Sequence, residues 1–398
     1  MVSDGRPPGA PDTLDPGFWG DLDAMHETFR TLRTQGPLAR DEANNLWIAV
    51  SHSAVLEIER RADTFVNSEG YRSFALPDED NMIALDDPRH AEQRRVVSRQ
   101  FTPRAVRANE SYLTALIGEL VDAFLADDSF EVVSQLAAPL PARLTAHLLG
   151  FDERRWRDLQ TWSERLMRYD AALTDVEART GIAAAIAEFG PRLLDLSEGR
   201  RTDPADDLIS VWANALLDGC PLARETLVNE AGLMISGGAE TARTVIARGL
   251  AIFAEHPDQW DAMAADPDLV TGAVEELIRW VTPLNNFFRV AGAEASVGGQ
   301  TIAAGERVML AYPSANRDEA VFDDPYRFDI GRSPNPHVAF GFGSHFCLGA
   351  SLARYELNLV FRHLAASITD LVVLEPPDIE ANVFVGAVRS FRLGFARR

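Results

Sequence analysis

The sequence predicts a mainly α-helical protein with a small β region, folded as a single domain over residues 16–398. Apolar residues recur at three- and four-residue spacing through much of the chain, whereas strand signals are short and scattered. No change in composition marks a boundary between domains. The first residues, 1–15, are rich in Pro, Gly and Asp, so we expect them to form a flexible N-terminal segment.

Helical periodicity predicts nine helices of ordinary length. They cover 21–34, 89–100, 103–127, 139–148, 152–169, 175–197, 205–218, 268–280 and 348–368. A tenth, much longer helix is expected over 222–257, where Pro257 ends it. Gly237 and Gly238 lie in the middle of this helix, and we expect them to interrupt it because adjacent glycines weaken the hydrogen-bond ladder.

Strand signals are limited to residues 46–50 and to residues 297–312, which we expect to form a hairpin with Gly-rich turns. Residues 314–343 have no periodicity and are rich in Pro, Asn, Asp and Gly. A loop of this length is uncommon inside a compact domain unless it serves a functional site.

The composition excludes several classes of protein. Lys and Arg number 38 against 60 Asp and Glu, and the net charge of −22 argues against general binding to nucleic acid or anionic membranes. Two cysteines, Cys220 and Cys347, exclude a disulfide framework and a multi-cysteine metal site. The chain shows no signal peptide and no stretch of ~18 apolar residues, so we expect a soluble cytoplasmic protein without a membrane span.

The most informative segment is HVAFGFGSHFCLGASLAR (337–354), in which Cys347 lies between a Gly-rich turn and an amphipathic helix. A thiolate at this position faces free backbone N–H groups and the positive end of the helix dipole, which should lower its pKa and suit it to bind a metal. Gly341 and Gly343 allow a tight turn and the close approach of a flat cofactor. The alternative is an inert buried thiol, and Cys220 is interpreted as an incidental thiol in a loop.

The spacing Phe340-x-x-Gly343-x-x-x-Cys347-x-Gly349 resembles the cysteine-ligand loop of the cytochrome P450 family at every defining position. The resemblance implies that Cys347 binds the iron of haem b (iron protoporphyrin IX), with Phe340 and Gly349 beside the cofactor and His345 donating to a propionate. Thiolate ligation of haem iron favours cleavage of the O–O bond.

A second segment that resembles the family is Gly237-Gly238-Ala239-Glu240-Thr241 in the long helix. A hydroxyl with a nearby carboxylate can deliver protons to iron-bound oxygen through water. By resemblance, Glu240 and Thr241 are the catalytic acid–alcohol pair, whereas the alternative is a solvated glutamate at a helix break. Thr244, one turn further on, is expected to pack against a neighbouring helix.

A third segment contains Glu276 and Arg279, which lie at i and i+3 on one helix face and can form an ion pair. An exposed pair of this kind would contribute only about 0.3 kcal/mol. The resemblance implies instead that the pair is buried and completed by Arg332, forming a structural brace for the cysteine loop.

Three cationic residues match the family positions that face the haem propionates, namely His90, Arg94 and Arg289. Arginine presents a planar fork to a carboxylate, which suits this assignment. The alternative for each one alone is an ordinary surface residue.

Together these motifs imply the fold of the family, a triangular helical domain that encloses haem between a long distal helix and a proximal cysteine-ligand loop. They also imply a monooxygenase that activates O2 and hydroxylates or epoxidises its substrate. No Gly-x-Gly-x-x-Gly motif is present, so ferredoxin and ferredoxin reductase are the expected electron donors. A local group of arginines could bind an acidic ferredoxin, namely Arg89, Arg94, Arg95, Arg99, Arg104 and Arg107.

The substrate pocket is expected to be mostly apolar, which favours a steroid, lipid or terpenoid slightly over a polyketide or macrolide. A peroxygenase or a non-catalytic haem sensor could use the same scaffold, but the acid–alcohol pair disfavours both. The predicted pocket residues, with the two asparagines as polar anchors, are Asn285, Asn286, Phe287, Gly237, Phe384 and Val385.

Overall fold

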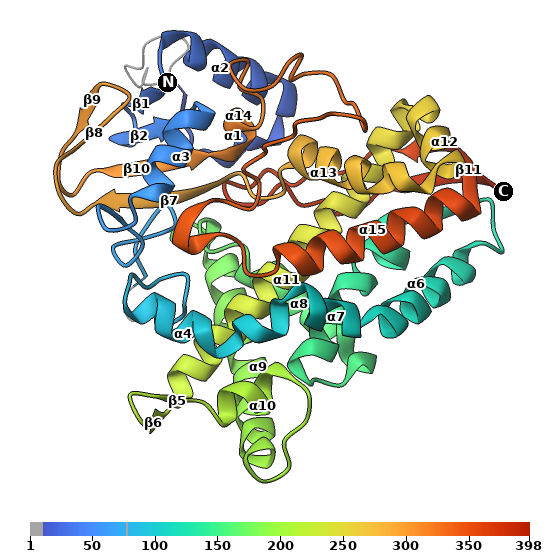
Figure 1. The fold of residues 1–398 in the computed structure, drawn as a ribbon, viewed down its shortest axis with the longest axis horizontal. Helices are drawn as coiled ribbons and strands as arrows, with labels where there is room; N and C mark the ends of the chain where they lie inside the picture. Colours follow the sequence, from blue (N-terminus) through green and yellow to red (C-terminus); the bar gives the residue numbers. More distant parts are fainter. Residues whose placement is uncertain (1–10, 77–78) are drawn as a thin grey trace.

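Helices make up most of the computed structural model, which describes residues 11–76 and 79–398 (Figure 1). The outline is roughly triangular, with the largest sheet in one corner and helices over the rest. The expected flexible segment falls mostly outside the described residues. In its described part, the backbone N–H and the hydroxyl of Thr13 both donate to Asp41, at 2.9 and 2.8 Å. No described helix is both long and apolar enough to cross a membrane.

The helices of the described chain confirm a mainly α-helical fold. They are α1 (Pro16–Gly20), α2 (Leu22–Gln35), α3 (His52–Arg60), α4 (Arg89–Val97), α5 (Pro103–Ala108), α6 (Glu110–Phe124), α7 (Pro139–Leu149), α8 (Trp156–Leu166), α9 (Val176–Thr202), α10 (Leu208–Ala213), α11 (Arg224–Glu255), α12 (Pro257–Ala265), α13 (Val270–Val281), α14 (Tyr312–Ala315) and α15 (Ala350–Ser367).

The strands are short and form four small sheets among the described residues. They are β1 (Leu38–Asp41), β2 (Leu46–Ala49), β3 (Phe65–Val66), β4 (Ser129–Glu131), β5 (Leu216–Leu217), β6 (Cys220–Pro221), β7 (Asn286–Ala291), β8 (Ala295–Val297), β9 (Gln300–Ile302), β10 (Arg307–Ala311), β11 (Ile368–Glu375) and β12 (Arg392–Arg397). The largest sheet has the order β1-β2-β10-β7-β3, and a second sheet has the order β11-β12-β4.

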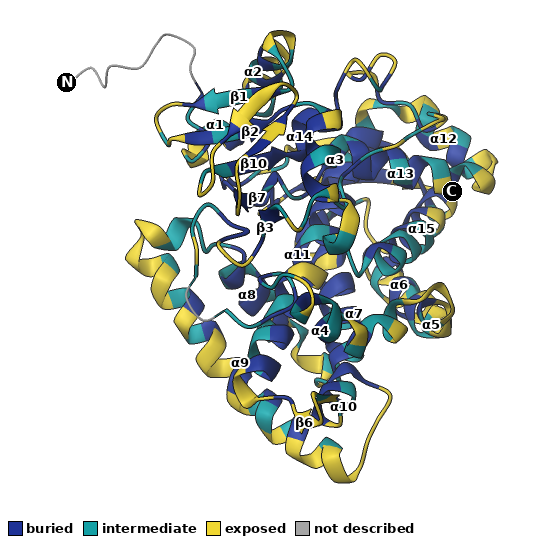
Figure 2. Ribbon diagram, turned by 60° about the vertical axis from the view of Figure 1, so that its left-hand side comes forward, coloured by how far each residue is buried: buried dark blue, intermediate teal, exposed yellow. Residues whose placement is uncertain are grey.

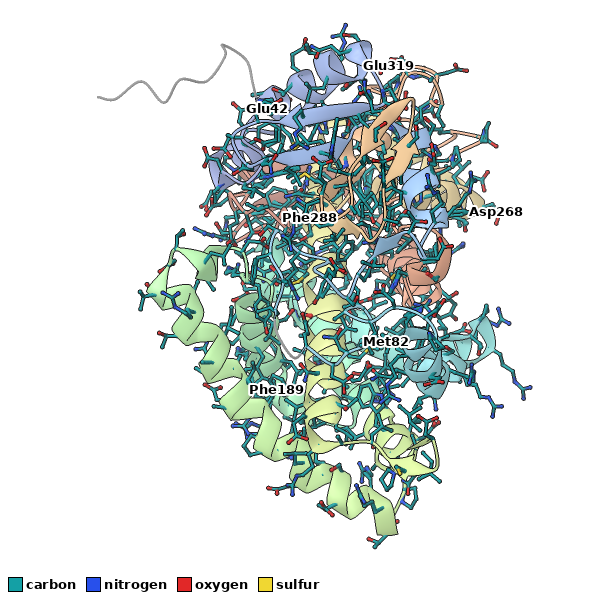
Figure 3. All side chains as sticks on the ribbon, turned by 90° about the vertical axis from the view of Figure 1, so that its left-hand side faces the viewer. Glu42, Met82, Phe189, Asp268, Phe288 and Glu319 are labelled. Carbon is teal, nitrogen blue, oxygen red and sulfur yellow. The ribbon has the colours of Figure 1, made fainter. Side chains whose placement is uncertain are left out.

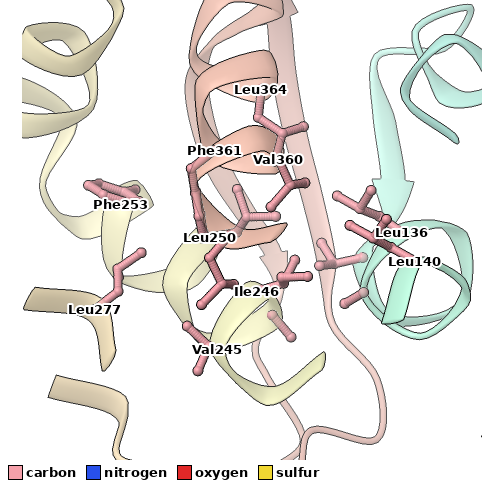
Figure 4. Packing of buried hydrophobic residues seen from close by; sticks show 14 of the residues in the cluster. Leu136, Leu140, Val245, Ile246, Leu250, Phe253, Leu277, Val360, Phe361 and Leu364 are labelled. Atoms are coloured by element: carbon pink, nitrogen blue, oxygen red, sulfur yellow. The ribbon is translucent and has the colours of Figure 1, made fainter. Parts of the chain in front are cut away.

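The long helix α11 is the centre of the hydrophobic core. Its second half is buried on almost every side, whereas α9 presents a largely exposed face (Figure 2). Leu250 of α11 lies in one cluster with Leu277 of α13 and Phe361 of α15 (Figure 4). At Gly249 the backbone of α11 approaches α15 so closely that a Cβ atom would lie 2.9 Å from Cζ of Phe361. A side chain at this position would therefore force the ring of Phe361 to shift.

Four of the predicted elements differ from the structure. The predicted helix 103–127 is divided at Asn109 into α5 and α6, and the predicted helix 205–218 is limited to α10, followed by the strands β5 and β6. The helix α11 continues through Gly237 and Gly238 without interruption, because packing against its neighbours outweighs the low helix propensity of glycine.

The fourth, the predicted hairpin 297–312, is wrong in its second half. Only β8 and β9 form a hairpin, with a turn at Gly298 and Gly299, whose φ angles of 55° and 82° favour glycine. The strand β10 lies instead between β2 and β7. In contrast, residues 316–342 contain no helix or strand, as the composition of this segment predicts.

Candidate cofactor site and active site

A mainly apolar cavity of about 260 Å³ lies between α11 and the loop that precedes α15. Gly237, Gly238 and Thr241 line it from α11, and Cys347 and Phe340 line it from the loop. Polar side chains gather along its boundary, from segments far apart in the sequence, and include Glu59, His90, Arg94, Arg289 and His345. The structure thus brings the sequence-predicted cysteine, cationic and glycine residues to one cavity.

The loop at Cys347 is closed by its own backbone. The N–H of Cys347 donates to the carbonyl of Phe340 at 2.9 Å, and Gly341 and Gly343 have φ angles of 67° and 72°. A Cβ atom at Gly343 would lie 2.3 Å from the carbonyl oxygen of Glu59, so this turn packs directly on α3. The Gly-rich composition is therefore needed for the turn and for its close contact with α3.

Burial raises the pKa of the Cys347 thiol above its usual value, while the backbone N–H groups of Gly349 and Ala350 and the charge of Arg94 act in the opposite direction. The sequence-based expectation of a lowered pKa is therefore wrong for the free thiol. The predicted N–H groups at the start of α15 do face the sulfur, but desolvation is the larger effect. The side chain is partly accessible because it lines the cavity.

The predicted trio behind this loop forms one buried ionic cluster. Glu276 and Arg279 have no exposed surface, and Arg279 donates to both carboxylate oxygens of Glu276 at 2.7 Å. Nε of Arg332 lies 3.2 Å from both of these oxygens. Arg279 also donates to the carbonyls of Asn316 and Pro325, at 2.9 and 3.0 Å. The cluster therefore fixes several points of the irregular loop to α13.

A neighbouring network escaped the sequence analysis, although Glu275 is adjacent to Glu276. Arg354 of α15 donates to Glu275 at 2.7 and 2.9 Å, and Nε2 of His337 lies 3.1 Å from the same carboxylate. The Arg354 guanidinium also lies over the ring of Phe340, 4.5 Å from its centroid. Although burial acts against it, hydrogen bonds from His337 and Arg354 lower the pKa of Glu275 to about 2.

One edge of the cavity collects groups suited to bind carboxylates. The rings of His90 and His345 lie with their centroids 4.1 Å apart, and Nη2 of Arg94 donates to the carbonyl of Phe346 at 2.6 Å. Arg289 of β7 is buried, with Nη2 3.6 Å from Oε1 of Glu59. Burial and the charges of Arg289, His90 and Arg94 lower the pKa of His345 to about 2.

The cavity fits a flat cofactor that carries carboxylates. Nε2 of His90 is buried and has no hydrogen-bond partner within the described part of the chain, although the His90 side chain lines the cavity. At Gly237 a Cβ atom would meet nothing within 4 Å, so α11 leaves open space opposite the cysteine loop. A thiol on one side, a bare helix surface on the other and donors at the edge match a haem with its propionates.

On the distal side, Thr241 and Glu240 lie on different faces of α11. Thr241 lines the cavity, and its hydroxyl donates to the carbonyl of Gly237 at 2.9 Å. Glu240 is only 1% exposed and faces an ionic cluster, in which Nη1 of Arg243 lies 3.4 Å from its carboxylate. Burial raises the pKa of Glu240, while Arg243 and Arg168 act in the opposite direction. Thr244 is fully buried, as expected.

The predicted polar anchors of the pocket are wrong. The side-chain N–H groups of Asn285 and Asn286 donate to backbone carbonyls of residues 382–383, and neither side chain lines the cavity. Val385 also lies outside it, paired with Leu284 in an isolated bridge. Of the predicted pocket residues, Gly237, Phe287 and Phe384 do line the cavity.

Several cavity residues had no recognisable signal in the sequence. Met82 lies beside α11 (Figure 3), and its backbone N–H donates to Glu230 of that helix at 2.8 Å. Arg72 lines the cavity with a buried Nη1 that has no partner among the residues described, while its other nitrogens donate to Tyr71. Glu356 of α15 is a buried carboxyl group, and burial raises its pKa to about 8.

Comparisons with known proteins agree with this geometry. The family model for cytochrome P450 matches residues 192–366. A steroid C26-monooxygenase of Mycobacterium tuberculosis is 37% identical over 362 residues, 90% of each chain. A methyl-branched lipid omega-hydroxylase of Mycobacterium bovis is 32% identical over 399 residues, 94% of this chain and 92% of the relative. The structure of Mycobacterium marinum cytochrome P450 CYP268A2 in complex with pseudoionone superposes with a TM-score of 0.90 at 32% identity, covering 99% and 100% of the two chains.

We predict that Glu356→Gln changes stability in the opposite direction to Glu275→Gln. The folded-state pKa of Glu356 is raised to about 8, so the cost of keeping this group in the folded protein grows as the pH rises from about 4.5 to 8. As the pH rises from 5 to 8, the free energy of unfolding of Glu356→Gln should therefore increase by about 1–3 kcal/mol relative to the wild type, as measured by urea unfolding.

The matched variant Glu275→Gln should lose stability, because the lowered pKa of Glu275 makes its ion pair stabilising above pH ~4.5. This loss should be largest at pH 5 and above and shrink as the pH falls toward 2. If the stability of both variants relative to the wild type changed with pH in the same direction, the opposite pKa shifts of Glu356 and Glu275 would be contradicted.

Proposed function

Because the chain belongs to the cytochrome P450 family, its cofactor is haem and its activity is that of a monooxygenase, and we propose that its substrate is a steroid or a methyl-branched lipid. The observation that carries this proposal is the distal lining of the cavity. It consists of apolar side chains contributed by several elements, namely Met82, Ile83, Leu233, Met234, Val245, Leu284, Phe287 and Phe384.

An apolar pocket of this kind selects its substrate by shape and by burial of apolar surface, about 25 cal/mol per Å². The relatives named for steroid C26 and methyl-branched lipid oxidation support the same substrate class. Because Asn285 and Asn286 are engaged with residues 382–383, the free Nη1 of Arg72 is the polar group that we assign to an oxygen atom of the substrate.

When bound, haem ligated by a thiolate supplies the reductive activation of dioxygen and the transfer of one oxygen atom. We assign Cys347 as the ligand of the iron and His90, Arg94, Arg289 and His345 to the propionates. Phe340 and Gly349 border the sulfur, and the cluster of Glu276, Arg279 and Arg332 holds the loop in place. These assignments are supported by the unpaired His90 nitrogen and by the convergence of the cationic groups.

We further propose that Thr241 supplies a proton in the distal cavity. Its hydroxyl can rotate away from the carbonyl of Gly237 to donate to a water or ligand oxygen. Glu240 directly precedes it on α11, and burial raises the pKa of this carboxyl group, which favours its protonated form. Glu240 contacts Arg243, which also binds the partly exposed Glu164, so these contacts link the acidic group to a carboxylate that solvent can reach.

An external electron donor is required, and we propose a ferredoxin that binds beside the cysteine loop. The exposed residues near this loop combine apolar and basic groups. Phe342 and Phe346 are exposed on the loop, and Arg95, Arg99, Arg104 and Arg107 are exposed on or next to α4 and α5. Arg94 is left out of this proposed binding surface because it donates to the loop, and Arg89 lies near Glu92 and Asp218. Cytoplasmic location stays a prediction, supported by the low cysteine content.

The substrate assignment predicts that steroids with an intact side chain and methyl-branched fatty acids convert the haem from low to high spin and give hydroxylated products. Optical titration followed by mass spectrometry of turnover mixtures checks both points. Turnover of a macrolide, with no product from either predicted class, would overturn the assignment.

Thr241→Ala should lower the yield of hydroxylated product per NADH consumed by about 10-fold or more, because a positioned proton donor is lost. The matched control is Thr244→Ala, whose hydroxyl bonds the carbonyl of Glu240 and lies outside the cavity. This control should keep the wild-type yield while losing about 1 kcal/mol of stability. Equal yields in Thr241→Ala and the wild type would refute the assigned role.

The double variant Arg95→Glu/Arg99→Glu should slow reduction by ferredoxin about 10-fold at low ionic strength, because basic residues speed up the encounter with an acidic partner. Stopped-flow reduction of the carbon monoxide complex measures this rate. Arg179→Glu/Arg201→Glu on α9 makes the same charge change elsewhere and should have little effect. The ferredoxin site is wrong if both double variants are slowed equally.

A further inference from the structure

A second cavity, of about 320 Å³, shares no lining residue with the haem cavity. It lies between one face of α2, Arg248 of α11, Trp280 of α13 and the segment that contains Arg317 and Tyr326. None of these residues takes part in the binding of haem or in the proton transfer proposed at Thr241. The most unusual feature of this cavity is its pair of buried arginines.

Arg248 and Arg317 are 9% and 3% exposed. Nη1 of Arg248 donates to the carbonyl of Val281 at 3.2 Å, and Nη2 of Arg317 donates to the carbonyl of Trp280 at 2.9 Å. Nη1 of Arg317 is buried without a hydrogen-bond partner, and neither arginine forms an ion pair with any described residue. Neither guanidinium group is therefore paired directly with a carboxylate of the described chain, and Glu276 acts on Arg317 only through its charge.

The pKa values of groups around the cavity reflect this positive field. Nδ1 of His26 is buried and unpaired within the described chain, and burial together with Arg317, Arg248, Arg33 and Arg279 lowers the pKa of His26. Burial, then Arg279 and Arg248, lower the pKa of Arg317 to about 9. Burial alone lowers the pKa of Arg248 to about 10. These shifts express the cost of a desolvated charge with too few counter-ions.

Among the described lining residues, acidic groups lie only at the mouth of the cavity. Asp23 and Glu27 lie on the exposed face of α2, and Glu27 is paired with Arg30 at 3.3 Å. Because these side chains are exposed, solvent screens their effect on the interior. They disfavour large polyanions at the entrance, while a small anion can still reach the two arginines.

We propose that this cavity binds a small oxyanion, a carboxylate- or phosphate-bearing molecule, between the guanidinium groups of Arg248 and Arg317. A buried charge is costly unless it is paired, and a bound oxyanion would pair both arginines at once. Each guanidinium presents a planar fork to carboxylate or phosphate oxygens. The indole of Trp280, 4.7 Å from the Arg317 guanidinium, fixes the orientation of one fork, and neutral His26 supplies a further donor.

The position of the site connects it to the brace of the cysteine loop. Trp280 follows Arg279 directly, and Arg317 follows Asn316, whose carbonyl accepts a hydrogen bond from Arg279 and whose side chain accepts one from the N–H of Val338. An anion that binds only the folded protein stabilises it by RT ln(1 + [L]/Kd), where [L] is the free anion concentration. Occupancy should therefore be visible in the stability of the holoprotein, without any measurement of activity.

Inorganic phosphate serves as the probe in thermal unfolding of the holoprotein at pH 7, compared with potassium chloride at equal ionic strength. We expect the wild-type melting temperature to rise with the logarithm of the phosphate concentration once this exceeds the apparent Kd. In Arg248→Met and in Arg317→Met, the apparent affinity for phosphate should fall at least tenfold. Arg179→Met, an exposed arginine on α9, should respond as the wild type does.

Equal stabilisation by phosphate and chloride, or an unchanged phosphate response in both Met variants, would overturn the proposal. If neither Met variant folds, 31P line broadening of phosphate by the wild-type holoprotein decides the matter. Saturable broadening that a small dicarboxylate displaces supports the site, and its absence at 100-fold excess over the protein rejects it. Displacement by dicarboxylate but not by an organic phosphate would identify the carboxylate as the preferred source of the oxyanion.

Discussion

The haem-binding loop depends on one constraint, the charge of the fully buried Glu276. Arg279 and Arg332 balance this charge. Loss of one member of a buried ion pair leaves an uncompensated charge and costs about 3–5 kcal/mol. Through Arg279 and Arg332 this cluster attaches the irregular loop to α13, and α13 packs on α11 and α15. The position of the Cys347 loop relative to α11 thus depends in part on a cluster whose residues do not line the cavity.

The two sides of the haem cavity are built by different means. The proximal side is fixed by hydrogen bonds and charges, including the pairing of Glu275 with Arg354 and the backbone contact of Gly343 with Glu59. The distal side is a helix surface without a side chain at Gly237, opposite apolar residues from several elements. This division suits a cofactor that must stay in one position and a substrate that is selected mainly by shape.

The sequence predicts most of the proximal site because its motifs are local, but it mispredicts the pocket where strand geometry decides. Side chains alternate along β7, so Phe287 and Arg289 face the cavity while Asn286 and Phe288 face the other side of the sheet. A shift of one residue along the strand would turn an asparagine from its structural position toward the cavity. Glu59 and Glu356 were missed because their burial depends on contacts between elements distant in sequence. The thiol pKa was mispredicted because the helix terminus was considered without the opposing effect of burial.

Five of the buried arginines in the described chain differ in how far carboxylates compensate their charge. Arg279 and Arg243 contact carboxylates within the chain, so their role is accounted for by folding. Arg289 has Glu59 nearby at the cavity edge, where burial raises the pKa of that carboxyl group to about 7 and thereby weakens the compensation. Arg248 and Arg317 have no ion-pair partner in the described chain. The folded state bears the free-energy cost of each uncompensated charge. A bound anion therefore stabilises the protein most where an arginine is incompletely paired. In one cavity this anion is a haem propionate, and in the other it is the proposed small oxyanion.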